Sequence, residues 1–328
     1  MGFWVNVWKY PSVVKQVLSD VKNITTELEL LKNDPHLPEA AQQILNHKKA
    51  FHRVSQYALV HGVLNFGIAR YWGRKLTPEE VSATLYACAS GPFFDDFFDE
   101  NQHEPEELFQ LIQEKINIPL KSHKEIAYAY LLKKVYHFVA DKSRFYEFFQ
   151  EVYQAQWQSK SLLNPELPRS ELAAISARKG AVSAWVFRSL ISEPISPEEL
   201  NMLEQLGYLG QFMDDIFDLY DDHHEGLQTL ANDYSGDFTP VYEKFLKEIE
   251  ELKVLIQKLP FSKNRKMRFQ RELMLMVSGG ILACQHFLKV QRKYGHLDIQ
   301  NIPRKELIVD MESKKNHVKM LLLALKYA

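Results

Sequence analysis

Helical periodicity runs through almost the whole sequence, and this feature restricts the chain to an all-α fold. Apolar residues recur at three- and four-residue spacing, whereas Asn-Gly hairpin turns and sustained alternation of Val, Ile and Thr do not occur. Thr77-Pro78-Glu79-Glu80 and Ser196-Pro197-Glu198-Glu199 each combine an N-cap residue, a proline and two acids, which is typical of helix starts. The sequence predicts an all-α, single-domain bundle of about ten or more helices around a central cavity, spanning residues 1–328.

Composition excludes several other classes. Hydrophobic residues make up 46% of the chain and charged residues 25%, without a low-complexity linker, so one globular domain is expected. The longest nearly apolar stretch, residues 273–288, is too short for a membrane span, and the first residues do not resemble an export signal. Cys88 and Cys284 sit in apolar helical contexts, which fits a reducing cytoplasm. With a net charge of −2 and dispersed basic residues, we expect no nucleic-acid partner.

Two acidic pentads of one form stand far apart in the chain. They are Asp95-Asp96-Phe97-Phe98-Asp99 and Asp214-Asp215-Ile216-Phe217-Asp218, and the second continues to Asp221 and Asp222. On a helix, positions i and i+4 share a face, so Asp214, Asp218 and Asp222 form a ladder of carboxylates. Such pairs repel by about 0.2–0.5 kcal/mol each when exposed.

The local sequence leaves this repulsion unneutralised. Lys and Arg are absent from residues 76–114 and 189–243, which hold ten and thirteen acidic residues respectively. Hard oxygen ligands that can share a cation with phosphate suit Mg²⁺, so the pattern predicts a magnesium-bridged diphosphate. Two other readings remain open. Each pentad also fits an ordinary amphipathic surface helix, and a non-catalytic helical metal-binding protein would carry the same acids.

Each pentad is expected late in its helix. The first helix is predicted from about Pro78 toward Asn101, and the second from about Pro197 toward Glu225, with Gly226 as its C-terminal stop. Both acidic clusters are therefore expected to gather at one mouth of the bundle.

Together these motifs resemble the class I isoprenoid synthase superfamily, in which D-D-x-x-D on one helix precedes D-D-x-x-D-x-x-x-D on another; here they are 119 positions apart. The resemblance implies that Asp95 and Asp99 hold two Mg²⁺ ions and that Asp214, Asp218 and Asp222 hold a third. The three ions would bind the diphosphate of an allylic isoprenoid substrate. Asp96 and Asp215 complete the two metal motifs, and the resemblance also implies a possible homodimer.

Further candidate residues follow from the same resemblance. Arg178-Lys179-Gly180-Ala181 is similar to the Lys-Thr-Ala segment of prenyltransferases, which makes Lys179 the candidate diphosphate contact and Arg178 a candidate diphosphate sensor. Gln154 is similar to a glutamine that precedes that lysine. Carbocation chemistry needs an apolar, aromatic cavity. The candidate wall residues are Phe94, Phe98, Trp185 and Phe212.

Departures from the superfamily pattern decide the predicted subclass. Elongating prenyltransferases bind isopentenyl diphosphate through basic segments around the first motif, but Glu100-Asn101-Gln102-His103-Glu104 follows it here. This favours a terpene synthase that ionises one substrate, with a trans-prenyltransferase second and a squalene or phytoene synthase third. The early basic cluster is His47-Lys48-Lys49-Ala50-Phe51-His52-Arg53. It is either a solvated helix face or, through Lys49-Ala50-Phe51-His52, similar to the Lys-x-Phe-His stretch of the bacterial large terpene synthases. Small residues at Ser90 and Gly91 predict a substrate of 15 carbons or more.

Overall fold

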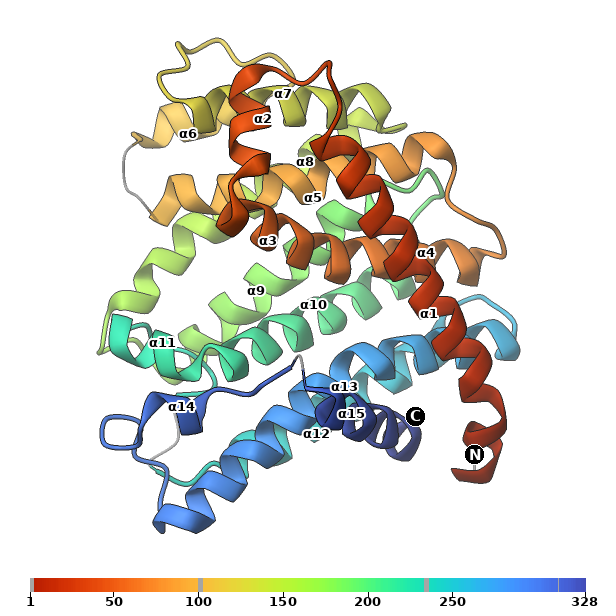
Figure 1. Cartoon of the computed structure of the whole chain (residues 1–328), viewed down its shortest axis with the longest axis vertical. Helices are drawn as coiled ribbons and strands as arrows, with labels where there is room; N and C mark the ends of the chain where they lie inside the picture. Colours follow the sequence, from red (N-terminus) through yellow and green to blue (C-terminus); the bar gives the residue numbers. More distant parts are fainter. Residues whose placement is uncertain (1–2, 100–102, 233–235, 312) are drawn as a thin grey trace. The chain divides into compact units, whose positions relative to one another are not determined.

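The structure, a computed structural model, describes residues 3–99, 103–232, 236–311 and 313–328, with side chains described from residue 9 onward. Every regular element in these residues is helical, which confirms the all-α prediction and the expected number of helices (Figure 1). The α-helices are α1 Phe3–Lys32, α2 Glu39–Asn46, α3 Lys48–Tyr57, α4 Val63–Trp72, α5 Pro78–Asp99, α6 Pro105–Leu111, α7 His123–Phe138, α8 Lys142–Ser159, α9 Arg169–Arg188, α10 Pro197–Phe217, α11 Leu219–Glu225, α12 Thr239–Lys258, α13 Lys263–Tyr294, α14 Arg304–Leu307 and α15 Lys314–Tyr327. A π-helical turn, η1 Ala58–Gly62, joins α3 to α4, and a 3₁₀ turn, η2 Lys160–Leu163, follows α8.

The contacts of the chain group into two compact units. The N-terminal unit comprises Lys15–Trp157 and Ala184–Pro194, and the C-terminal unit comprises the described part of residues 1–14 together with Gln158–Ser183 and Ile195–Ala328. Each unit is described by itself below. The single domain around a central cavity stays a prediction.

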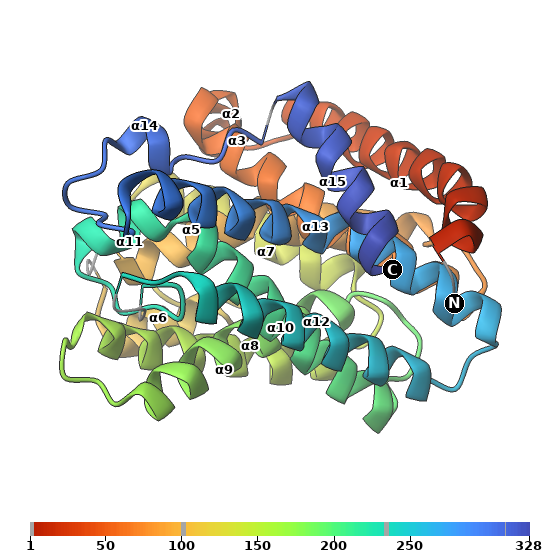
Figure 2. The ribbon, with the colours of Figure 1, turned by 90° about the horizontal axis from the view of Figure 1, so that it is seen from below.

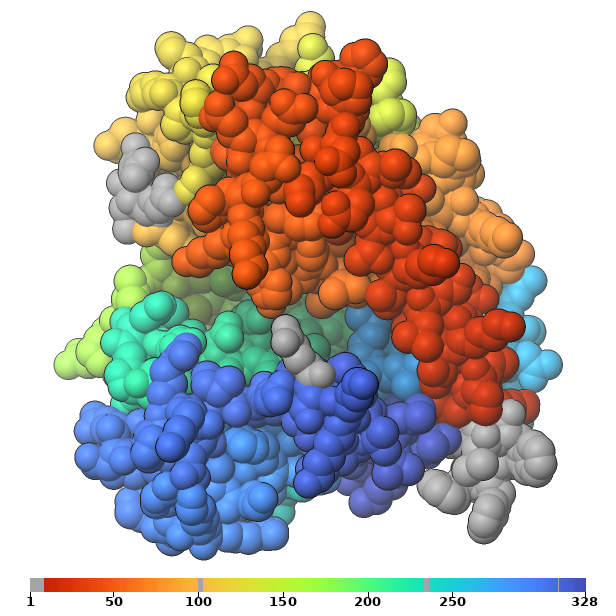
Figure 3. Space-filling view, in the orientation of Figure 1, coloured from red at the N-terminus to blue at the C-terminus, as the bar shows by residue number. Residues whose placement is uncertain are grey.

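In the N-terminal unit, α5 is the central helix. It packs against α7 along much of its length and also against α3 and η1, while α2 covers α7 (Figure 1). The start of α5 confirms the predicted cap, because the Glu80 amide donates to the Thr77 hydroxyl over 3.3 Å and the Glu80 carboxylate accepts from the Thr77 amide over 2.9 Å. Helices α2 and α3 form much of the visible surface of this unit (Figure 3).

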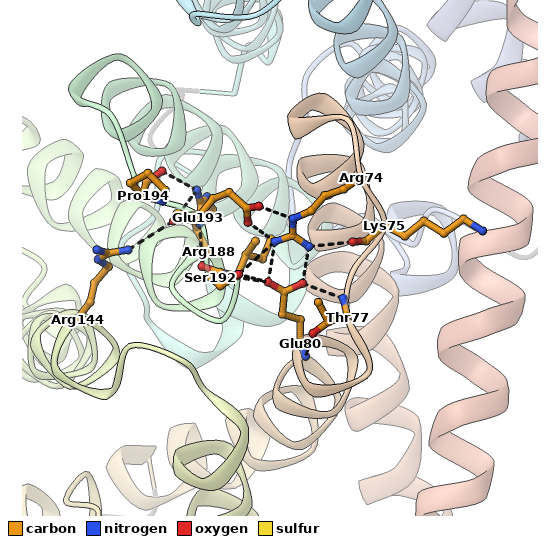
Figure 4. Close-up of polar contacts among 10 residues, drawn as sticks. Arg74, Lys75, Thr77, Glu80, Arg144, Arg188, Ser192, Glu193 and Pro194 are labelled. Atoms are coloured by element: carbon orange, nitrogen blue, oxygen red, sulfur yellow. Dashed lines mark hydrogen bonds and ion pairs between the residues drawn. The ribbon is translucent and has the colours of Figure 1, made fainter.

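A partly buried ion-pair network ties the start of α5 to the segment that follows α9 (Figure 4). The Arg74 guanidinium donates to both oxygens of Glu80, over 2.6 and 2.7 Å, and also pairs with Glu193. Glu80 is only 4% exposed and accepts from the Ser192 amide and hydroxyl, each over 2.8 Å. Although burial raises the pKa of the Glu80 carboxyl, the hydrogen bonds from Arg74, Ser192 and Thr77 lower it to about 2. The fully buried Arg188 fixes the same segment by donating to its backbone carbonyls.

In the C-terminal unit, α10, α12 and α13 pack against one another, and α15 lies along α13 (Figure 2). The predicted start of α10 is confirmed, because the Ser196 hydroxyl accepts from the Glu199 amide over 3.1 Å. By length and composition, α13 is the one described helix that would be able to cross a membrane, but 67% of its most apolar stretch is buried in the protein.

Candidate functional site

The first acidic motif occupies the last turns of α5, and Asp95 is its best-supported member. The Tyr57 hydroxyl at the end of α3 donates to Asp95 Oδ2, and Gln156 Nε2 from α8 donates to Asp95 Oδ1 over 2.6 Å. Both oxygens of the half-buried carboxylate are therefore oriented by hydrogen bonds from neutral donors.

Gly91 explains how Tyr57 reaches Asp95. A Cβ atom at position 91 would lie 2.7 Å from Cε1 of the Tyr57 ring, so only glycine leaves room for the ring one turn before the motif. This contact also affects the predicted substrate length. The space beside Gly91 is filled by Tyr57, so the small residue does not by itself open a deeper tunnel.

Asp96 corrects the expectation that the motif lacks compensating cations. Arg53 Nη1 lies 2.5 Å from Asp96 Oδ1, and Lys124 Nζ lies 3.0 Å from Asp96 Oδ2. These cations come from α3 and α7, outside the lysine- and arginine-free stretch, so the local sequence conceals them. Asp96 is thereby paired on both oxygens. Asp99 lies at the end of α5 and is exposed. The segment Glu100-Asn101-Gln102 that follows lies outside the described residues.

A cavity of about 200 Å³ adjoins this ion pair. Arg53, Lys124 and Asp96 line it together with His47, and the remaining wall consists of Ile44, Ala50, Pro92 and Phe93. The early basic cluster thus contributes Arg53 and His47 to a pocket beside the first motif. Such a pocket presents cations and nitrogen donors to an anion.

The second acidic motif differs from the predicted continuous helix. Helix α10 ends at Phe217, Asp218 adopts φ −91° and ψ 8°, and α11 begins at Leu219. The one-turn hydrogen bonds nevertheless continue, from the Asp218 amide to the Asp214 carbonyl over 2.9 Å and from the Asp222 amide to the Asp218 carbonyl over 2.8 Å. The ladder therefore keeps its i,i+4 spacing across the junction. The predicted stop is confirmed, because Gly226 caps α11 with φ 74°.

The carboxylates of this motif are electrostatically strained. Burial raises the pKa of Asp215 to about 6, against hydrogen bonds from Gln211 and from the Leu230 amide. Burial and then the neighbouring carboxylates raise the pKa of Asp218 to about 7 and that of Asp222 to about 8. Burial of the carboxyl group also raises the pKa of Asp214. A bound cation would relieve this repulsion.

Lys179 acts on the same cluster. Its charge lowers the pKa of Asp214 and of Asp215, opposing the effect of burial. The adjacent Gly180 explains the proximity, because α9 crosses α10 where Gly180 meets Gly207. A Cβ atom on either glycine would overlap the backbone of the other helix. Lys179 is therefore close enough to the acidic ladder to act on its charge, and Arg178 is half-buried next to it. The predicted contact of Lys179 with diphosphate stays a prediction.

The aromatic residues predicted to contact the substrate are all buried, three in the N-terminal unit and one in the C-terminal unit. Phe94 and Phe98 are each 3% exposed in the core of the N-terminal unit, and Trp185, 8% exposed, packs against Phe148. Phe212 is inaccessible and packs between Tyr208 and Phe245 in the C-terminal unit.

Gln154 is exposed, whereas Gln156, on the opposite face of α8, is the glutamine that contacts Asp95. Sequence reasoning missed Gln156 and Tyr57. The signal that pointed nearest to Tyr57 was its place after the basic cluster on α3, four positions beyond Arg53.

The all-oxygen donor set of the ladder fits Mg²⁺, and the raised pKa values show that these carboxylates favour a cation or a proton as partner. Within residues 3–99, 103–232, 236–311 and 313–328, no group of three or more metal-ligating side chains lies close enough together to hold a metal ion. Because the two motifs belong to different units, their approach to a common mouth stays a prediction. Comparison of the chain with protein-family models, curated proteins and solved structures finds no match.

Proposed function

We propose that this protein is a magnesium-dependent class I terpene synthase, which ionises an allylic isoprenoid diphosphate of 15 carbons or more and releases diphosphate with a linear or cyclic terpene. The observation that carries the proposal is the ladder of Asp214, Asp218 and Asp222, which keeps its spacing across the α10–α11 junction and has raised carboxyl pKa values. Carboxylates held in this strained state gain free energy from a divalent cation.

The residues take distinct roles in this proposal. The ladder would hold one Mg²⁺ ion, and Asp95 and Asp99 would hold two more. When bound, the ions supply Lewis-acid stabilisation of the departing diphosphate. Tyr57 and Gln156 orient Asp95 for this purpose, and Lys179 offers a charge-assisted hydrogen bond to a diphosphate oxygen near the ladder. Aromatic residues of the wall would shield the carbocation from water.

One observation favours a second candidate function. The cavity beside Asp96 brings together Arg53, Lys124 and His47, which are residue types that bind a diphosphate. A trans-prenyltransferase that condenses the allylic substrate with isopentenyl diphosphate needs such a second anion site. The prenyltransferase therefore stays a candidate although no arginine follows the first motif, because Arg53 on α3 and Lys124 on α7 supply cations beside it.

Paired variants on α10 and α11 test the first candidate. Asp218→Asn removes a ladder carboxylate, whereas Asp221→Asn removes an exposed carboxylate that pairs with Arg304 over 3.1 Å. We expect Mg²⁺ with inorganic diphosphate to raise the melting temperature of the wild type and of Asp221→Asn but not of Asp218→Asn. Equal stabilisation of all three proteins, or equal stabilisation by Ca²⁺ alone, would favour a non-catalytic metal-binding protein.

Product analysis separates the two enzymatic candidates. The purified protein with Mg²⁺ is incubated with allylic diphosphates of 10 to 25 carbons, each with and without isopentenyl diphosphate. Hydrocarbon or alcohol from the allylic substrate alone supports the terpene synthase. Longer diphosphates that form only with isopentenyl diphosphate, and that disappear in Arg53→Ala, support the prenyltransferase.

A further inference from the structure

His61 is a histidine of the N-terminal unit to which the proposed function gives no role. It lies in η1, the π-helical turn between α3 and α4, one turn after Tyr57. Single π-helical turns are rare, and many occur at functional sites because they turn side chains out of α-helical register. The turn is pressed against α1, since a Cβ atom on Gly62 would come within 2.9 Å of Ile24 Cγ1. The imidazole therefore has a defined direction.

Aromatic contacts hold the imidazole ring in place. It stacks on Phe187 with 3.8 Å between the ring centroids and 5° between the planes, and the Tyr57 ring lies 5.6 Å away. Phe187 is itself fixed, because its carbonyl accepts from the fully buried Asn65 over 3.0 Å. His61 is thus separated from Asp95 by one ring, that of Tyr57, whose hydroxyl donates to the carboxylate.

One ring nitrogen of His61 lacks a hydrogen-bond partner within the part of the chain that the structure describes. Its Nδ1 is buried without a hydrogen-bond partner. A buried polar group without a hydrogen bond destabilises the folded protein, so its presence here needs an explanation. The side chain as a whole is only half-buried, so part of the ring remains open to a ligand. The buried hydroxyl of Tyr128 is also unpaired, but Tyr128 is fully enclosed between Phe94 and Phe97 and offers no access.

We infer that His61 is the base that ends the reaction, accepting a proton from the carbocation formed beside Asp95. In this step the C–H bond next to the cationic carbon breaks and its electron pair forms the new C=C bond. The proton bonds to Nε2 of His61, because Nδ1 is buried. The released diphosphate or water then takes up that proton. The products are a hydrocarbon, diphosphate and one proton, and no other reactant is needed. The inference rests on the proposed terpene synthase function and specifies deprotonation as its outcome.

The surroundings of His61 suit this role. Burial lowers the pKa of the imidazole to about 3, so the ring is neutral at physiological pH and holds a free lone pair. A carbocation is acidic enough to protonate so weak a base. The stacked Phe187 and the tilted Tyr57 hold the imidazole in an aromatic environment.

The test compares product ratios with the amount of diphosphate released. His61→Phe keeps a flat ring against Phe187 but removes the basic nitrogens, and His137→Phe makes the same change at an exposed histidine of α7. We expect His61→Phe to lower the yield of hydrocarbon per diphosphate released by about tenfold or more, with alcohol from water capture in its place. His137→Phe should give the wild-type ratio.

His61→Ala provides a second, independent readout. It leaves a space of the size of the ring, and added imidazole should restore the hydrocarbon fraction, which a purely structural role of His61 would not allow. An unchanged ratio in folded His61→Phe, or failure of imidazole to shift the ratio in His61→Ala, overturns the assignment. If the wild type releases no diphosphate from any allylic substrate, the proposed function itself fails and this inference falls with it.

Discussion

Gly207→Ala tests the close crossing of α9 and α10 that brings Lys179 to the acidic ladder. The added Cβ atom would lie 2.7 Å from the backbone nitrogen of Ala181, which is 0.7 Å inside ordinary contact at 3.4 Å, and it would overlap the Gly180 carbonyl. Both obstacles are helix backbone, so no side-chain rotation relieves them. The helices must separate, and overpacking of this kind costs about 1–3 kcal/mol even after the gain in helix propensity.

Gly210→Ala is the matched control, because it lies on the same helix and its Cβ atom would meet no heavy atom within 4 Å. Replacing an unobstructed helical glycine by alanine stabilises by about 0.5–1 kcal/mol. Urea unfolding followed by circular dichroism should therefore move the two midpoints in opposite directions from the wild type. If Gly207→Ala is as stable as Gly210→Ala, the backbone contact does not exist and the argument for the position of Lys179 fails.

Three further predictions concern charged groups. Because the folded chain keeps a proton on Asp222 up to about pH 8 and the unfolded chain loses it near pH 4, the unfolding free energy of the metal-free protein should fall as pH rises through that range. Urea titrations should show a shallower fall for Asp222→Asn, and an identical slope would contradict the raised pKa. Arg74→Met leaves the buried carboxylate of Glu80 without its cation, although Ser192 and Thr77 still donate to it, and should cost about 3–5 kcal/mol of unfolding free energy. Lys142→Met breaks an exposed pair with Glu114 and should cost less than about 1 kcal/mol, so equal losses would refute the distinction. Gln156→Leu removes a hydrogen bond to charged Asp95 worth about 1.5–3 kcal/mol, and should slow diphosphate release about tenfold more than Gln154→Leu does.

The sequence identified much of the local structure. Helix starts at Pro78 and Pro197 follow from caps whose hydrogen bonds join residues three positions apart, and Gly226 ends α11 because glycine adopts positive φ without steric cost. The ladder of Asp214, Asp218 and Asp222 follows from the helical repeat. These features involve neighbours in the sequence, so periodicity and residue type are enough to predict them.

Other features of the candidate site could not be read from the sequence. The sequence showed a stretch without Lys or Arg around Asp96, but Arg53 and Lys124 reach Asp96 from helices 43 and 28 positions away. Gln154 was predicted from its likeness to a prenyltransferase glutamine, but the rotation of α8 decides which amide meets Asp95, and that amide belongs to Gln156. The sequence also did not predict that the helix breaks at Asp218. The aspartates keep their four-residue spacing through the break, and the one-turn hydrogen bonds continue across it.

The sequence by itself determined that this chain is all-helical, where its helices begin, and that two acidic motifs repeat at helical spacing. Only the tertiary structure decided which carboxylates are paired and which stay strained, that Tyr57 occupies the space left by Gly91, and that Lys179 stands beside the ladder where Gly180 crosses Gly207. The physical reason is that helix propensity acts over one or two turns. Charge compensation and steric fit, in contrast, depend on side chains that packing brings together from distant parts of the chain.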